Sequence, residues 1–176
     1  NDHLNRSVCY ALLQGKSKDT VVLIGHSDTV DVEDFGKIKD IAYEPEKIKE
    51  AFKNGQVDVL DKVKKDLTDE WLFGRGICDM KAGGAIEMAL FEKYVQDEDF
   101  PGSVLLVAVC DEENLSAGMR HLSYILDDLN KRYGLNYKLI IDGEPHERID
   151  KNTVIIYDGS IGKIMPICLT RGKLTH

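Results

Sequence analysis

Apolar residues in this chain form short, β-branched runs, separated by charged segments with helical periodicity. Four runs have the length of buried strands, namely residues 7–14, 20–25, 103–110 and 137–141. The spacing of apolar residues predicts helices over 81–96 and 116–133. Strands that alternate with helices of this length indicate βαβ units and a largely parallel sheet.

Local signals refine these elements. The first helix should carry an apolar stripe of four residues, Ile86, Ala89, Leu90 and Tyr94. Ser116 is expected to cap the second helix, and Gly134 follows its end. Weaker strand-like runs cover residues 71–73, 153–157 and 161–169.

Residues 31–70 differ from the rest of the chain because they are rich in charge. They read as a helical insertion over the surface, with helices at 45–53 and 57–67. Pro45 suits a first helical turn, and Asn54-Gly55 suits its end.

The composition narrows the class of protein. A chain of 176 residues with 43% hydrophobic and 31% charged residues fits one globular domain. The net charge of −8 argues against a nucleic-acid or membrane partner, and no run approaches the roughly 20 apolar residues of a membrane helix. The chain starts at Asn1, which suggests that the natural start is missing, and no signal-peptide pattern follows.

Four cysteines, Cys9, Cys78, Cys110 and Cys168, form no CxxC pair. This spacing argues against a structural zinc finger. We expect reduced, buried cysteines, which fit a cytoplasmic protein.

Chemistry-bearing residues stand just after the apolar runs. His26-Ser27-Asp28 follows VVLIG, Asp111-Glu112-Glu113 follows SVLLVAVC, and Glu144 follows KLIIDG, while Asp79 lies in the turn GRGICDMKAGG. In an open α/β sheet, ligand sites gather at the carboxyl ends of the strands. A histidine and several carboxylates there predict a divalent metal site, and two ions fit the number of groups.

Each motif also has an ordinary reading. Asp28 shares a face with His26 and can fix its tautomer, but both could simply end a strand. Asp79 can bridge two cations or cap helix 81–96. Glu112 and Glu113 point in different directions, which suits a general base beside a metal ligand, or else they form a solvated turn.

Taken together, HSDTV, GRGICDMKAGG, DEE and GEP resemble a family of co-catalytic zinc metallopeptidases and deacylases. That family includes acetylornithine deacetylase, succinyl-diaminopimelate desuccinylase, aminoacylase and glutamate carboxypeptidases. VDVEDFG and SAGM are similar to its arginine-utilisation branch. The resemblance implies a three-layer α/β/α sandwich with a mixed, largely parallel sheet.

The resemblance also implies roles for individual residues. His26, Asp79 and Glu144 would bind one Zn²⁺, and Asp79 would bridge to a second ion held by Glu113. Glu112 would be the general base and Asp28 would orient His26. The Asp79–Met80 peptide is expected to be cis. Co²⁺ or Mn²⁺ could replace Zn²⁺ at such a mixed site.

The end of the chain resembles the family's G-K-x-x-H motif, in which His176 would polarise the scissile carbonyl. We therefore expect residues 1–170 to be the amino-terminal part of a catalytic domain, and 171–176 to begin a lid or dimerisation domain. The last metal-ligand histidine would lie beyond residue 176, so the chain alone should be inactive and its metal sites partial or empty. A homodimer through the lid is also implied.

The expected activity is hydrolysis of an amide bond in a small N-acyl amino acid or short peptide, in amino-acid or arginine utilisation. Two alternatives remain open: an aminopeptidase on the same metal core, and a non-catalytic module that keeps the fold.

Overall fold

The computed structural model describes residues 3–146, 149–150, 152–159 and 168–172. The chain divides into two compact units, Asn1–Pro145 and His146–His176. All helices and strands of the described residues lie in the first unit. His176 and residues 161–167 lie outside the described residues, so the role of His176 and the strand expected there stay predictions.

The first unit is built on a mixed four-stranded sheet in the order β1-β3-β2-β4. The strands are β1 (Cys9–Gln14), β2 (Asp19–His26), β3 (Ser103–Val109) and β4 (Asn136–Asp142). β2 pairs in parallel with both β3 and β4, whereas β1 runs antiparallel at one edge. The predicted α/β fold with a largely parallel sheet is confirmed.

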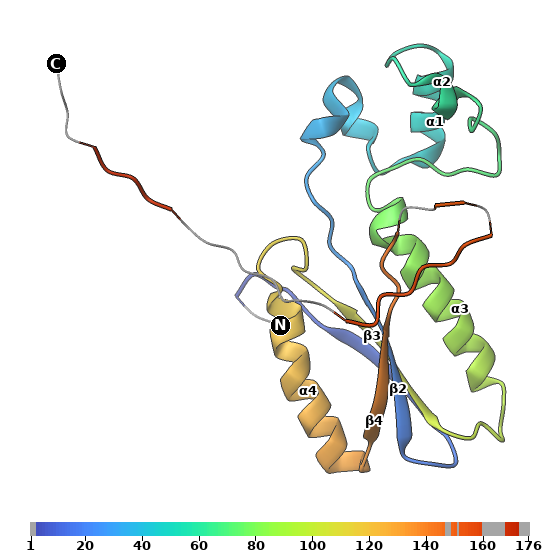
Figure 1. The fold of residues 1–176 in the computed structure, drawn as a ribbon, viewed down its shortest axis with the longest axis vertical. Coiled ribbons are helices and arrows are strands. Elements are labelled where there is room, and N and C mark those ends of the chain that lie inside the picture. The colour runs from blue at the N-terminus through green and yellow to red at the C-terminus, as the bar shows by residue number, and fades with distance from the viewer. Residues whose placement is uncertain (1–2, 147–148, 151, 160–167, 173–176) are drawn as a thin grey trace. The chain divides into compact units, whose positions relative to one another are not determined.

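Helices cover both faces of this sheet. Figure 1 shows α3 (Gly83–Val95) and α4 (Ala117–Tyr133) on opposite sides of the strands. The main core lies between the sheet and α4, where Ile24 and Leu105 pack with Leu122 and Leu129. Because strand residues alternate between faces, Val21 and Leu23 instead face a groove lined by α3. The layers are therefore α4, sheet and α3.

The insertion between β2 and α3 has a small core of its own. It contains a 3₁₀ segment η1 (Glu33–Ile41), α1 (Pro45–Lys53) and the short α2 (Asp61–Lys64). Ile38, Ile48 and Ala51 are buried there against partly buried aromatic residues. The helix at 45–53 is confirmed with its predicted bounds, but the one at 57–67 shrinks to a single turn.

The helix expected at 81–96 is confirmed as α3, and Ile86, Leu90 and Tyr94 of its predicted stripe line the groove beside the sheet. Ile86 is nevertheless 63% exposed, and the buried side chain of that helix is Glu87. Two predictions of secondary structure are wrong. Residues 71–73 form no strand, and Phe73 packs edge-on against Phe52, with ring centroids 5.6 Å apart. Residues 153–157 form no strand either, and Val154 and Ile156 are exposed.

The predicted end of α4 is correct, but the residue predicted to cap its start is not. Gly134 adopts a left-handed φ of 69° and donates its N–H to the carbonyl of Asn130, as expected for a helix end. Ser116 does not cap the helix with its side chain, and its own φ is 53°. Asp111 takes that role, because its carboxylate accepts the N–H of Ala117 at 3.1 Å.

The structure also tests the predicted burial of the cysteines and the length of the helices. All four cysteines are free, but Cys9, Cys78 and Cys168 are exposed and Cys110 is half-buried, so their predicted burial is wrong. Among the described residues, no helix is both long enough and apolar enough to cross a membrane.

α4 approaches β3 closely through Gly118. A Cβ at this position would lie 2.5 Å from both the backbone nitrogen and the carbonyl oxygen of Cys110. We predict that Gly118→Ala lowers the free energy of unfolding by about 3 kcal/mol, measured by urea denaturation, because neither backbone atom can move freely. Gly84→Ala is the matched control: its Cβ meets no atom within 4 Å, and it should raise stability by roughly 0.5–1 kcal/mol. Equal effects of the two variants would contradict the contact.

Candidate metal centre

The strand register brings the predicted site residues to one edge of the sheet. His26 lies opposite Val109 in the β2–β3 pair, and Ile24 lies opposite Asp142 in the β2–β4 pair. The segment after β3 carries Glu112 and Glu113, and the segment after β4 carries Glu144. Both segments therefore leave the sheet beside His26, at the carboxyl end where α/β proteins bind ligands.

His26 is the buried centre of the site, with 7% of its surface exposed. Its Nε2 lies 2.8 Å from Asp79 Oδ1 and 3.4 Å from Glu144 Oε1. Its Nδ1 lies 2.9 Å from the backbone carbonyl of Asp28, so a proton on Nδ1 would leave Nε2 to face the carboxylates. Burial lowers the pKa of His26, but the hydrogen bond with Asp79 and the charge of Glu144 outweigh it, and the net pKa is raised.

Asp28 acts differently from the prediction. The acceptor for His26 is its backbone carbonyl, while its carboxylate stands 3.7 Å from Nδ1. That carboxylate instead accepts the N–H groups of Glu112 at 3.1 Å and Glu113 at 3.2 Å. Asp28 therefore ties the acidic loop after β3 to the end of β2.

Asp79 enters the site from the turn before α3. The Asp79–Met80 peptide is cis, as the resemblance implied. Met80 is 1% exposed, and its sulfur accepts the backbone N–H of His26 at 2.9 Å. Met80 thus packs under the sheet edge, while the Asp79 side chain remains 53% exposed above it.

The triplet Asp111-Glu112-Glu113 divides into a structural residue and two site residues. The carboxylate of Asp111 accepts hydrogen bonds from Ala117 and Asn114 and pairs with Arg6 at 2.9 Å. The hydrogen bond from the Ala117 backbone, with those from Asn114 and Arg6, lowers its pKa. Glu112 and Glu113 have their backbone held by Asp28, and their carboxylates are available to the site.

Glu144 shows the electrostatic cost of gathering these acids. Its pKa is raised to about 7, mainly by burial, and the charges of Asp142, Asp79 and Glu112 add to this while His26 opposes it. A cation bound beside Glu144 would offset that repulsion.

Two groups of side chains in this cluster could hold an ion. Ligand atoms of His26, Asp79 and Glu113 all lie within 4.8 Å of one another, and so do those of His26, Glu112 and Glu144. The predicted division placed Glu113 apart from His26, whereas the structure groups them. The second group borders a cavity of about 440 Å³, which Ser116 and Met119 also line.

The chemistry of these donors fits a divalent metal. Imidazole nitrogen and carboxylate oxygen are the ligands that Zn²⁺, Co²⁺ and Mn²⁺ share. Three protein ligands with an adjoining cavity match the open arrangement of catalytic rather than structural zinc sites. The raised pKa of Glu144 also favours a cation here, because burial and neighbouring carboxylates oppose its negative charge.

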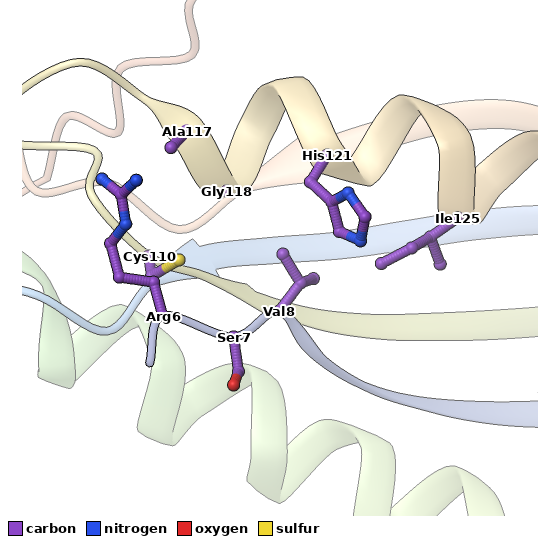
Figure 2. Close-up of a pocket in the computed structure, with 8 residues that line it drawn as sticks. All are labelled: Arg6, Ser7, Val8, Cys110, Ala117, Gly118, His121 and Ile125. Atoms are coloured by element: carbon purple, nitrogen blue, oxygen red, sulfur yellow. The ribbon is translucent and has the colours of Figure 1, made fainter. Parts of the chain in front are cut away.

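A second cavity lies nearby and has a different character. It measures about 340 Å³ between the segment Arg6–Val8 and α4, and Figure 2 shows His121 and Ile125 projecting from that helix beside Val8. None of the predicted metal ligands lines it. His121 lies at the exposed surface of α4, where it borders this cavity.

Sequence reasoning missed one buried acid. Glu87 on α3 is 5% exposed, and its pKa is raised to about 7 by burial and then by the charge of Asp142. The signal was present in the helical spacing, because Gly83, Glu87, Leu90 and Tyr94 share one face of the helix.

The fold is an α/β sheet whose carboxyl edge gathers a histidine and carboxylates that could hold a metal ion. The chain belongs to the peptidase family M20/M25/M40, whose model matches residues 52–162. It is 36% identical to Protein RocB of Bacillus subtilis (strain 168) over 183 residues, covering 100% of this chain and 32% of that protein. It is 34% identical to the uncharacterized protein YqjN of the same strain over 175 residues, covering 97% of this chain and 32% of that protein. The chain thus spans about a third of the length of these curated relatives.

The raised pKa of Glu87 has a consequence for stability. Between pH 4.5 and about 7, the unfolded chain releases the Glu87 proton while the folded chain retains it, so the free energy of unfolding falls as pH rises. Each pKa unit corresponds to about 1.4 kcal/mol, which gives a loss on the order of 3 kcal/mol. Urea denaturation in chelator across this range should show a smaller fall for Glu87→Gln than for the wild type. The same pH slope in both proteins would show that Glu87 ionises normally.

Proposed function

We propose that the full-length protein is a metal-dependent hydrolase that cleaves the amide bond of a small N-acyl amino acid or short peptide. The observation that carries this proposal is the convergence of His26, Asp79, Glu112, Glu113 and Glu144 in two overlapping groups at the carboxyl edge of the sheet. Membership in the peptidase family supports the class of reaction.

The proposed ligands fall into two sets, one for each metal ion. By the resemblance of the motifs, His26, Asp79 and Glu144 would hold one ion, and Asp79 with Glu113 would contribute to a second. The Asp28 carbonyl fixes the His26 ring, since an acceptor at Nδ1 favours a free Nε2 lone pair. A bound divalent cation supplies an acidified water and polarises the substrate carbonyl.

Glu112 is the proposed general base. Its carboxylate lines the cavity beside His26, where a small substrate has room. Glu112 accepts a proton from the attacking water and then delivers it to the leaving nitrogen, so that an amine rather than an amide anion departs. The Asp28 carboxylate, which binds the backbone N–H groups of Glu112 and Glu113, keeps this base in place.

The substrate class rests on the resemblance of the four motifs. Placement in arginine utilisation rests on VDVEDFG and SAGM, and the similarity to Protein RocB supports it. The aminopeptidase alternative uses the same core, and assays with acylated and free-amine substrates separate the two. The cytoplasmic location, supported by four free cysteines, and the homodimer are also proposals.

Metal binding by the chain itself tests the site. We expect weak, partial binding of Co²⁺, followed by its visible absorption, because the chain holds one full set of proposed ligands. His26→Ala should abolish the signal, since both ligand groups share this residue. His121→Ala, on the exposed surface of α4, is the matched control and should bind as the wild type does. Tight binding of two ions per chain, or an unaffected His26→Ala, would contradict the assignment.

The role of Glu112 is tested in the full-length protein. Glu112→Gln should lower kcat by at least about 10²–10⁴-fold because no base remains to move the proton. Metal content, measured by elemental analysis, should stay near that of the wild type. Asp97→Asn, at an exposed acid in the turn after α3, is the control for loss of one negative charge. Retained turnover in Glu112→Gln would sink the assignment, and a protein without bound metal would favour the non-catalytic alternative.

A further inference from the structure

Glu87 is a buried carboxyl group that the proposed mechanism does not use. It lies on α3 with 5% of its surface exposed, and its Oε1 has no hydrogen-bond partner among the described residues. Buried acids of this kind are uncommon, because removing a carboxylate from water costs several kcal/mol. The helix buries this acid while the neighbouring apolar residue Ile86 stays exposed, so we expect Glu87 to have a specific role.

Three glycines surround Glu87 and bring three backbones together. A Cβ at Gly83 would lie 2.0 Å from the carbonyl oxygen of Gly143, so α3 and the segment after β4 touch directly. A Cβ at Gly143 would lie 3.0 Å from Glu87 Oε1, and one at Gly25 would lie 3.7 Å from Glu87 Oε2. The carboxyl group therefore sits between β2, α3 and the segment after β4.

Each of these backbones leads directly into the metal centre. Gly25 precedes His26, and Gly143 precedes Glu144. A Cβ at Gly25 would also lie 2.6 Å from Cε of Met80, the residue after Asp79. The two glycines that lie against the Glu87 carboxyl group thus each directly precede a proposed ligand, and Glu87 is not itself a ligand.

We propose that Glu87 is a positioning residue that holds the Gly143–Glu144 segment against α3 and so sets the place of Glu144 beside His26 and Asp79. The Glu87 carboxyl group packs against the backbones of Gly25 and Gly143, and the backbone N–H groups of Ile24 and Gly143 favour its charged form. Gly143 donates its N–H to the carbonyl of Ile24 at 3.2 Å, which joins β2 to the segment after β4. The part of the inference that concerns metal rests on the proposed function.

A space-filling role is the competing explanation, and it makes different predictions. If Glu87 only filled volume, an apolar side chain of similar size would serve as well or better, because it removes an unpaired buried polar atom. If Glu87 positions the segment through its polar carboxyl group, the apolar variant should loosen that segment even where overall stability is unchanged.

Amide hydrogen exchange separates these roles without any metal. In Glu87→Leu, we expect the Gly143 amide to exchange about tenfold faster than in the wild type, while the Leu105 amide in the central strand β3 is unchanged or slower. Glu87→Gln keeps the hydrogen-bonding group and should stay within about threefold at both amides. Glu92→Gln, at an exposed acid of the same helix, is the matched control.

Three results would overturn the proposal. One is an unchanged Gly143 amide in Glu87→Leu, and another is an equal rise at Gly143 and Leu105, which reports global destabilisation. Glu87→Met repeats the test with an unbranched chain if the leucine variant does not fold. Loss of the fold in both apolar variants, with Glu87→Gln folded, would show a role in the whole domain rather than in this segment.

The metal centre gives a second measurement. Glu87→Leu should bind Co²⁺ roughly tenfold more weakly and with an altered visible spectrum, the size of effect known for residues that position ligands. Glu87→Gln should keep the wild-type spectrum. If neither this chain nor the full-length protein binds Co²⁺, the proposed function fails, whereas hydrogen exchange at Gly143 still decides the role of Glu87.

Discussion

β2 lies between β3 and β4, and it runs parallel to both. In a parallel pair, equivalent ends point the same way, so the segments that follow β2, β3 and β4 leave the sheet at one edge. The chain passes from β2 to β3 through α3 and from β3 to β4 through α4, on opposite faces of the sheet. The strands that follow β2 in the chain thus lie on both sides of it in the sheet, and such a change in strand order creates the crevice in which open α/β sheets bind ligands. Residues as distant as His26 and Glu144 can contact one another only because this pairing exists.

Close contact at this edge requires small residues beneath the acidic ones. Gly83 and Gly143 touch through their backbones, and Gly25 leaves room for Met80. Any side chain at these glycines would push apart the segments that carry Asp79 and Glu144. The position of the charged groups therefore depends on residues without side chains, and the Glu87 carboxyl group lies between two of them, Gly25 and Gly143.

Much of this architecture could be predicted from the sequence. Buried parallel strands leave near-continuous apolar runs, which is why β2 and β3 were found within one or two residues of their ends. The insertion was recognised by its charge, and its first helix by Pro45 and Asn54. Site residues could be predicted because strand ends in this fold meet at one edge. Antiparallel β1 was found as a strand, but its direction depends on long-range pairing that periodicity does not encode.

The failures have a common physical cause in tertiary contacts. Glu87 is buried on α3 and Ile86 stays 63% exposed at the groove beside the sheet, and the contact of Gly83 with Gly143 limits how the helix can rotate. Asp111 rather than Ser116 caps α4, because Ser116 adopts a left-handed backbone conformation. Asp28 uses its carbonyl toward His26 because its carboxylate is occupied by the backbone of the acidic loop. The first and third of these choices depend on a partner far away in the chain, whereas the cap of α4 is decided between Asp111 and Ala117, six residues apart.

The acids of this edge fall into two electrostatic groups, which separates structure from chemistry. Asp111 has its charge compensated within the protein by the Ala117 N–H, Asn114 and Arg6, and its pKa is lowered. Glu144 lacks comparable compensation, and its pKa rises to about 7 as burial and neighbouring carboxylates oppose ionisation. A group of the first kind is already satisfied and has no need of a cation. A group of the second kind gains most from one, because a bound ion replaces both the lost solvation and the missing positive charge. The electrostatics of the fold itself therefore separate Asp111, whose charge is satisfied within the protein, from Glu144, whose charge is not.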